Sequence, residues 1–218
     1  MSIRVLVADD QGIVRAGLTT ILQAHDGIEV VAQAVDGVEA VELARRLRPD
    51  VCLLDVRMPR MDGIEATRRL AGPGVQDPLA VVVITTFDTD EAVNGALRAG
   101  ARGFLLKDAG PELLVQAVRA AADGDALIAP RITARLLAGF ADTARPAARQ
   151  EPVVALTERE EEVAVTVARG LTNAEIAAEL HISLGTVKFH LAGLMAKLGV
   201  TNRVQVVIWA YETRRVVP

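Results

Sequence analysis

Residues 3–10 read IRVLVADD, an apolar run of strand length that ends in two carboxylates, Asp9 and Asp10. Three later apolar runs are each followed by one polar residue, which is Asp55, Thr85 or Lys107. Between these runs, apolar residues recur at a spacing near 3.6, which indicates helices. Strands that alternate with helices favour a parallel sheet covered on both faces. We therefore predict a doubly wound α/β domain in the first half of the chain.

The five polar side chains at the ends of these runs are predicted to form one site. In an open parallel sheet, ligands bind beyond the carboxyl ends of the strands, where the strand order reverses. Three carboxylates would repel one another there unless a hard divalent cation lay among them, and Mg²⁺ prefers such oxygen ligands. Asp55 stands alone on its run and is suited to accept a phosphoryl group covalently. Thr85 can donate to one phosphoryl oxygen, and Lys107 can pair with another.

Length and composition limit the class of protein. The 218 residues suffice for two domains, and no apolar stretch approaches the ~20 residues of a membrane span. Because no signal-type region opens the chain and Cys52 is the lone cysteine, we expect a protein of the reducing cytoplasm. Residues 1–123 carry a net charge of −5, whereas residues 180–218 carry five bases and one acid. The acidic half suits a metal site, and the basic end suits a polyanion.

The first domain, predicted over residues 1–123, resembles the receiver domain of bacterial two-component response regulators. Four stretches in order carry the resemblance: residues 7–10 (VADD), 54–63 (LDVRMPRMDG), 84–87 (ITTF) and 100–107 (GARGFLLK). The resemblance implies a flavodoxin-like fold with a five-stranded parallel sheet. The alternative is an unrelated doubly wound domain with scattered acids in its loops.

The resemblance also implies roles for residues of the first domain. Asp55 is the implied site of phosphorylation, and the implied ligands of Mg²⁺ are Asp9, Asp10, Asp55 and the backbone carbonyl of Arg57. Thr85 and Phe104 are the implied switch residues; Phe104 stands where the family often has tyrosine. Arg60 occupies a position where glycine is common, and we interpret it as a solvated surface residue.

A linker and a second domain are predicted after residue 123. Residues 124–154 contain a short amphipathic helix at 130–140 and then a Pro-, Ala- and Arg-rich segment without apolar period, which favours a mobile linker. Over residues 155–218, TERE at 157–160 and TNAE at 172–175 are capping boxes. Four short helices joined by tight turns follow from these signals, and the pair at about 173–180 and 184–198 describes a helix-turn-helix.

The second domain resembles the LuxR-type DNA-binding domain, so the whole chain resembles a NarL/FixJ-type response regulator. The resemblance is carried by residues 156–160 (LTERE), 168–177 (ARGLTNAEIA), 182–183 (IS) with 186–188 (TVK) and His190, and 197–200 (KLGV). The implied DNA contacts are Ser183, Thr186, Lys188, Phe189, His190 and Lys197. Among them, His190 suits packing better than base reading. The alternative is a helical protein-interaction domain whose bases form a solvated face.

Two small residues in the predicted recognition helix depart from the family pattern. Ala192 and Gly193 stand where polar or basic side chains are common. The lack of polar side chains at these two positions removes candidate phosphate contacts. We therefore expect one DNA-binding domain alone to bind DNA weakly.

These observations predict a transcription factor, not an enzyme, that a sensor histidine kinase phosphorylates at Asp55. Its expected partners are that kinase, double-stranded promoter DNA and a second copy of the chain on activation. One rival is a regulator of the same fold that responds to a ligand or to abundance. Another is an aspartyl phosphatase, but Arg57 stands where such an enzyme needs an acid.

Overall fold

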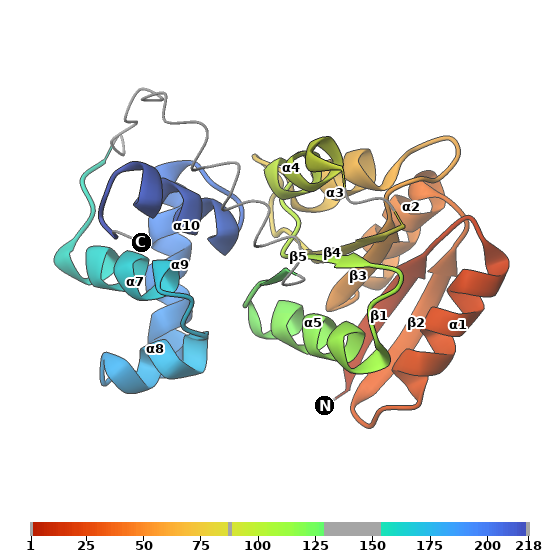
Figure 1. The fold of residues 1–218 in the computed structure, drawn as a ribbon, viewed down its shortest axis with the longest axis horizontal. Coiled ribbons are helices and arrows are strands. Elements are labelled where there is room, and N and C mark those ends of the chain that lie inside the picture. The colour runs from red at the N-terminus through yellow and green to blue at the C-terminus, as the bar shows by residue number, and fades with distance from the viewer. Residues whose placement is uncertain (1, 87–88, 129–153, 217–218) are drawn as a thin grey trace. The chain divides into compact units, whose positions relative to one another are not determined.

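The computed structural model describes residues 2–86, 89–128 and 154–216 (Figure 1). The chain divides into two compact units, Met1–Ala138 and Gly139–Pro218. The helix predicted at 130–140 lies outside the described residues, as does the predicted linker 141–154 apart from its last residue.

The first unit alternates strands and helices from its first strand to its last. Its elements are β1 (Ile3–Ala8), α1 (Gly12–Gln23), β2 (Ile28–Ala34), α2 (Gly37–Leu47), β3 (Val51–Asp55), α3 (Gly63–Ala71), β4 (Ala80–Thr85), α4 (Asp90–Arg98), β5 (Gly103–Leu106), α5 (Pro111–Asp123) and β6 (Leu127–Ile128). Helices α1 and α5 cover one face of the sheet and α2, α3 and α4 cover the other (Figure 1). The doubly wound architecture predicted from the sequence is confirmed.

The sheet is parallel throughout, with the strand order β2-β1-β3-β4-β5-β6. Every residue of β3, β4 and β5 is buried, as expected for strands covered on both faces. The five predicted strands are confirmed. The structure also has a sixth strand, β6, which consists of two residues and lies beyond position 123, where the predicted first domain ends. A strand of two residues has no recognisable apolar period, so the sequence pattern could not reveal it.

Local signals fix several helix ends. The Asp36 carboxylate caps α2 by accepting hydrogen bonds from the backbone N–H groups of Val38 and Glu39. Pro111 opens α5, and Gly124 ends it in the left-handed conformation with a φ of 86°. An acid at the N-cap, proline in the first turn and glycine at the stop are the residues that these helix ends favour.

The second unit is helical in its described residues. Its helices are α7 (Glu158–Ala168), α8 (Asn173–Glu179), α9 (Leu184–Leu198) and α10 (Arg203–Glu212). Both predicted capping boxes are present, Thr157 with Glu160 and Thr172 with Glu175. All four helices contribute to one buried apolar core, and Trp209 of α10 is its largest side chain. The predicted helix-turn-helix pair corresponds to α8 and α9.

Candidate functional site

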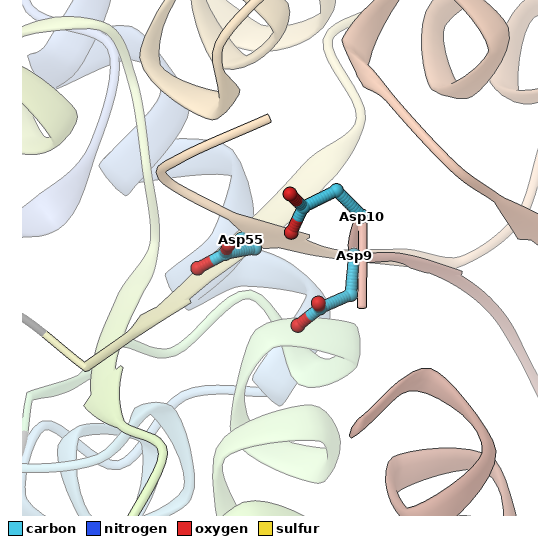
Figure 2. A group of neighbouring side chains, drawn as sticks. All are labelled: Asp9, Asp10 and Asp55. Atoms are coloured by element: carbon cyan, nitrogen blue, oxygen red, sulfur yellow. The ribbon is translucent and has the colours of Figure 1, made fainter. Parts of the chain in front are cut away.

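Three carboxylates meet at the carboxyl edge of the sheet in the first unit. Asp9 and Asp10 follow β1, and Asp55 ends β3 (Figure 2). One oxygen from each lies within 4.8 Å of the others. Asp9 and Asp55 are buried, whereas Asp10 is exposed. The group therefore has one side open to solvent.

The strand order explains why these residues meet. Strand β1 lies between β2 and β3, so the order reverses at β1 and β3, the place where ligands bind in this class of fold. Ala8 pairs with Leu54 across the two strands, which brings the next residue of each strand, Asp9 and Asp55, side by side. The predicted gathering of acids is thus a direct result of register.

Lys107 reaches this group from the end of β5. Its Nζ lies 2.6 Å from Asp9 Oδ2 and 3.2 Å from Asp55 Oδ2. The Lys107 backbone N–H donates to the Thr85 carbonyl at 2.8 Å, which ties the end of β5 to the end of β4. Thr85 is itself buried, with 1% of its surface exposed. The structure therefore brings Asp9, Asp55, Thr85 and Lys107 together from four strands.

Asp9 Oδ2 is buried and lies 2.6 Å from the Lys107 ammonium, its one charged partner among the described residues. Buried carboxylate oxygens that face positive charge are suited to bind a cation as ligands. The all-oxygen donor set of Asp9, Asp10 and Asp55 fits a hard divalent ion such as Mg²⁺.

Burial raises the pKa of the Asp55 carboxyl above its ordinary value. The Lys107 ammonium opposes this rise, and the neighbouring Asp9 carboxylate adds to it. Asp55 is only 3% exposed. The negative charge of Asp55 is therefore costly unless positive charge is close, and Lys107 supplies part of it.

A tight loop follows Asp55 and contains Arg57, the residue whose carbonyl is the fourth predicted metal ligand. The Gly63 N–H donates to the Val56 carbonyl at 2.9 Å and closes the loop at its base. A Cβ atom at position 63 would lie 2.0 Å from the Asp55 carbonyl oxygen. Only glycine permits this approach, so the chain returns beside the end of β3 as α3 begins.

The interpretation of Arg60 as a solvated surface residue is incomplete. Its side chain is 60% exposed, but its guanidinium pairs with the buried carboxylate of Asp36. The signals available in the sequence were an acid before α2 and a base at a position that favours glycine. They could not show that the two residues meet, because 24 positions separate them.

Phe104, the predicted aromatic switch residue, is fully buried in β5. The structure therefore has its ring in the inward position. The role of Phe104 as a switch residue stays a prediction.

The predicted DNA contacts lie mostly at the start of α9. Ser183 caps the helix, its hydroxyl 2.8 Å from that of Thr186. Lys188 is exposed, and Phe189 is 74% exposed. His190 is half-buried and meets the Phe189 ring edge-on at a centroid distance of 5.6 Å. Apolar and cationic surface thus lie next to each other on the outer side of α9.

Lys197 lies apart from that surface and has an internal partner. Its Nζ donates to Glu160 Oε2 at 2.6 Å and to the Ala155 carbonyl at 3.4 Å. A Cβ atom at Gly193, one turn earlier, would lie 3.0 Å from Glu160 Oε1. The small residue at 193 therefore leaves room for the Glu160 carboxylate, a role that the sequence pattern did not reveal.

Comparisons with known proteins agree with this geometry. Residues 5–119 match the model of the response regulator receiver domain, and residues 154–210 match that of the bacterial regulatory proteins of the luxR family. The transcriptional regulatory protein YxjL of Bacillus subtilis is 40% identical over 95% of this chain and 94% of its own length.

Two solved structures extend the likeness over nearly the whole chain. The response regulator ChrA of a heme-sensing two-component system is 39% identical over 99% of both chains, with a TM-score of 0.54. A structure of two RcsB dimers bound to two parallel DNAs is 25% identical, covers 97% of this chain and 99% of that one, and has a TM-score of 0.56.

Proposed function

This chain belongs to the response regulators that join a receiver domain to a LuxR-type DNA-binding domain, and we propose that phosphorylation of Asp55 controls its binding to DNA. It is a DNA-binding regulator of a two-component system. The proposal concerns the residues that take the phosphoryl group and those that read DNA. The observation that carries it is the buried Asp55 carboxylate, flanked by Asp9 and paired with Lys107.

Mg²⁺ is the proposed cofactor, held by the carboxylates of Asp9, Asp10 and Asp55 and by the backbone carbonyl of Arg57. When bound, the ion supplies positive charge that neutralises a transferring phosphoryl group. The support for this site is the all-oxygen donor set of three carboxylates that meet at the strand ends, two of which are buried.

The proposed donor is a phosphohistidine of a sensor kinase. One carboxylate oxygen of Asp55 attacks the phosphorus, a new O–P bond forms, and the N–P bond breaks with its electron pair left on the histidine nitrogen. The Lys107 ammonium is already 3.2 Å from Asp55 and compensates charge on the transferring group. The same pocket would allow water to hydrolyse the acyl phosphate slowly, which returns the protein to its resting state.

The phosphoryl group acts as a switch through Thr85 and Phe104. The Thr85 hydroxyl, at the end of the neighbouring strand β4, moves to donate to a phosphoryl oxygen. Phe104, which lies on β5 beside β4, is the second proposed switch residue and responds to this movement of Thr85. Contacts that exist only in the phosphorylated state shift the population toward one conformation.

DNA binding is assigned to the start of α9, the second helix of the helix-turn-helix. We infer that Thr186, Lys188 and Phe189 face the major groove, with Ser183 and His190 beside them. We leave Lys197 out of this set, because its ammonium is engaged with Glu160. The likeness to RcsB, which was solved as dimers on DNA, supports a homodimer on double-stranded promoter DNA. The proposed location of the protein is the cytoplasm.

The assignment of Asp55 is tested by its replacement with asparagine. Asp55→Asn keeps the shape of the side chain and removes the nucleophilic carboxylate, so we expect no labelling by radioactive acetyl phosphate. Wild-type protein should lose labelling when EDTA removes Mg²⁺ and regain it when Mg²⁺ is added back. Label retained on the Asp55→Asn variant would overturn the assignment.

DNA binding by the same variant distinguishes our proposal from the rival, a regulator that responds to a ligand or to abundance. That rival predicts equal DNA binding by wild type and Asp55→Asn after treatment with acetyl phosphate. Our proposal predicts tighter binding by the treated wild type only.

A further inference from the structure

The Asp36 carboxylate is buried and fully used. Its side chain is 2% exposed. Oδ1 accepts the N–H groups of Val38 and Glu39 at 2.8 and 3.0 Å, which caps α2. Oδ2 accepts from Arg60, whose Nε lies 2.6 Å away and whose Nη2 also contacts this oxygen. One carboxylate therefore holds both the start of α2 and the side chain of Arg60.

A second contact lies beside the first. The Gly37 N–H donates to the Met61 carbonyl at 3.1 Å, and a Cβ atom at Gly37 would lie 2.5 Å from that carbonyl oxygen. The loop at residues 56–62 is thus attached to the N-terminus of α2 through two neighbouring residues, Arg60 and Met61. Its base is closed by the Gly63–Val56 hydrogen bond.

Arg60 also departs from the usual backbone conformation. Its φ is 63°, in the left-handed region that is unfavourable for a residue with a Cβ atom. Glycine would adopt this conformation at lower cost. Arginine at this position therefore makes the backbone less favourable, and its contribution must come from the side chain.

We propose that Arg60 and Asp36 form a clamp that positions the loop 56–62 for metal binding at the acidic group. The loop includes Arg57, whose carbonyl is the proposed fourth ligand, so this inference rests on the metal site of the proposed function. Because Arg60 and Met61 fix the loop to α2, the loop has little conformational freedom left to lose when the ion binds. Without the clamp, ordering the loop opposes binding, and the affinity for the ion falls.

Two other roles for the Arg60–Asp36 ion pair fit the structure less well. A purely stabilising ion pair would not require the left-handed backbone, which costs stability. A contact with a partner protein would leave the guanidinium available, whereas here its Nε and Nη2 both point to Asp36.

The test uses Arg60→Gly in the full-length chain, with Mn²⁺ as the probe ion followed by electron paramagnetic resonance. Glycine keeps the left-handed backbone but leaves the buried Asp36 carboxylate without its positive partner, so we expect some loss of thermal stability, and binding is measured well below the unfolding temperature of the variant. We expect affinity for Mn²⁺ to fall about tenfold and amide hydrogen exchange at residues 57–61 to accelerate. Arg60→Lys, which keeps the charge and one donor, should restore part of the affinity.

Arg48→Gly is the matched control. Arg48 also has a left-handed backbone, with a φ of 47°, and also forms an ion pair, with the exposed Asp77. It lies at the other end of α2, remote from the acidic group. We expect this variant to bind Mn²⁺ as wild type does.

A double-mutant cycle with Asp36→Asn completes the test. If the two residues act as one clamp, Arg60→Gly combined with Asp36→Asn should lose no more affinity than the larger single loss. Unchanged Mn²⁺ affinity in Arg60→Gly, or fully additive losses in the double variant, would overturn the clamp. Failure of wild type itself to bind Mn²⁺ would instead overturn the metal site of the proposed function.

Discussion

Lys188 and Phe189 are adjacent on α9, and in the proposed interface they make two different kinds of contact with DNA. The Lys188 ammonium is exposed and can neutralise a phosphate or donate to guanine O6 and N7. Phe189 is 74% exposed and presents an apolar ring, which can contact the methyl group of thymine. An aromatic ring left in water is a cost that DNA binding would remove.

Substitutions at these two positions should therefore have different signatures. We expect Lys188→Ala to weaken DNA binding and, if it contacts phosphate, to lower the slope of log affinity against log salt by about 1. Phe189→Ala should leave that slope unchanged and weaken binding only to sites that contain the contacted thymine. Fluorescence anisotropy over a salt series, with thymine replaced by deoxyuracil in the second case, measures both. Wild-type affinity and slope in Lys188→Ala would remove this residue from the interface.

The start of α7 is held by a charge network rather than by a cap alone. Glu160 Oε2 accepts from the Thr157 N–H at 2.7 Å, and Lys197 of α9 donates to the same oxygen at 2.6 Å. Burial would raise the pKa of Glu160, but the hydrogen bonds from Lys197 and Thr157 outweigh this and lower the pKa to about 2. The pair connects α7 to the last turn of the recognition helix.

The second unit should therefore lose stability in acid. The folded-state pKa of Glu160, about 2, lies below its ordinary value of 4.5. Its stabilising contribution is thus present above about pH 4.5 and is lost as the pH falls from there through about 2. We expect Glu160→Gln to cost about 1–3 kcal/mol at pH 7 and much less at pH 3.

Trp209 provides the measurement, because it is the one tryptophan in the chain and lies in the core of the second unit. Urea unfolding followed by its fluorescence at the two pH values gives both free energies. Glu175→Gln is the control, since Glu175 closes the other capping box from an exposed position and should matter less. An equal loss for Glu160→Gln at both pH values would contradict the assigned role of the charge.

For the whole molecule, we predict that phosphorylation tightens DNA binding mainly by making two copies of the chain associate. The outer side of α9 offers few polar groups, with Ala192 exposed and Gly193 packed near Glu160. One copy should therefore bind DNA weakly. Two linked copies make the second contact intramolecular, which raises avidity ~10²-fold or more without any new contact.

Analytical ultracentrifugation with and without beryllofluoride, a mimic of the phosphoryl group, checks this prediction. We expect a monomer without the mimic and a dimer with it, in parallel with tighter binding to a site of two half-sites. Asp55→Asn, which cannot hold the mimic covalently, should stay monomeric in both conditions. A wild-type protein that remains monomeric yet gains DNA affinity would contradict association as the mechanism.

The sequence by itself determined the sheet, the acidic group and the helix caps. Apolar runs that end in Asp9, Asp55, Thr85 and Lys107 predict the strands, and the ligand rule for parallel sheets predicts that their ends meet. Both capping boxes of the second unit were also readable, because a capping box is a contact between residues three positions apart. Local patterns of this kind carry their own geometry, so no tertiary contact is needed to interpret them.

Only the tertiary structure decided what long side chains do with distant partners. Arg60 and Asp36 are 24 positions apart and Lys197 and Glu160 are 37 apart, and each pair joins two elements of its own unit. A flexible basic side chain on a helix or loop reaches solvent, DNA or a neighbouring acid equally well as judged from the sequence. Burial of Asp36 and Glu160 settles the choice, because a carboxylate removed from water needs a positive partner and the nearest base supplies it.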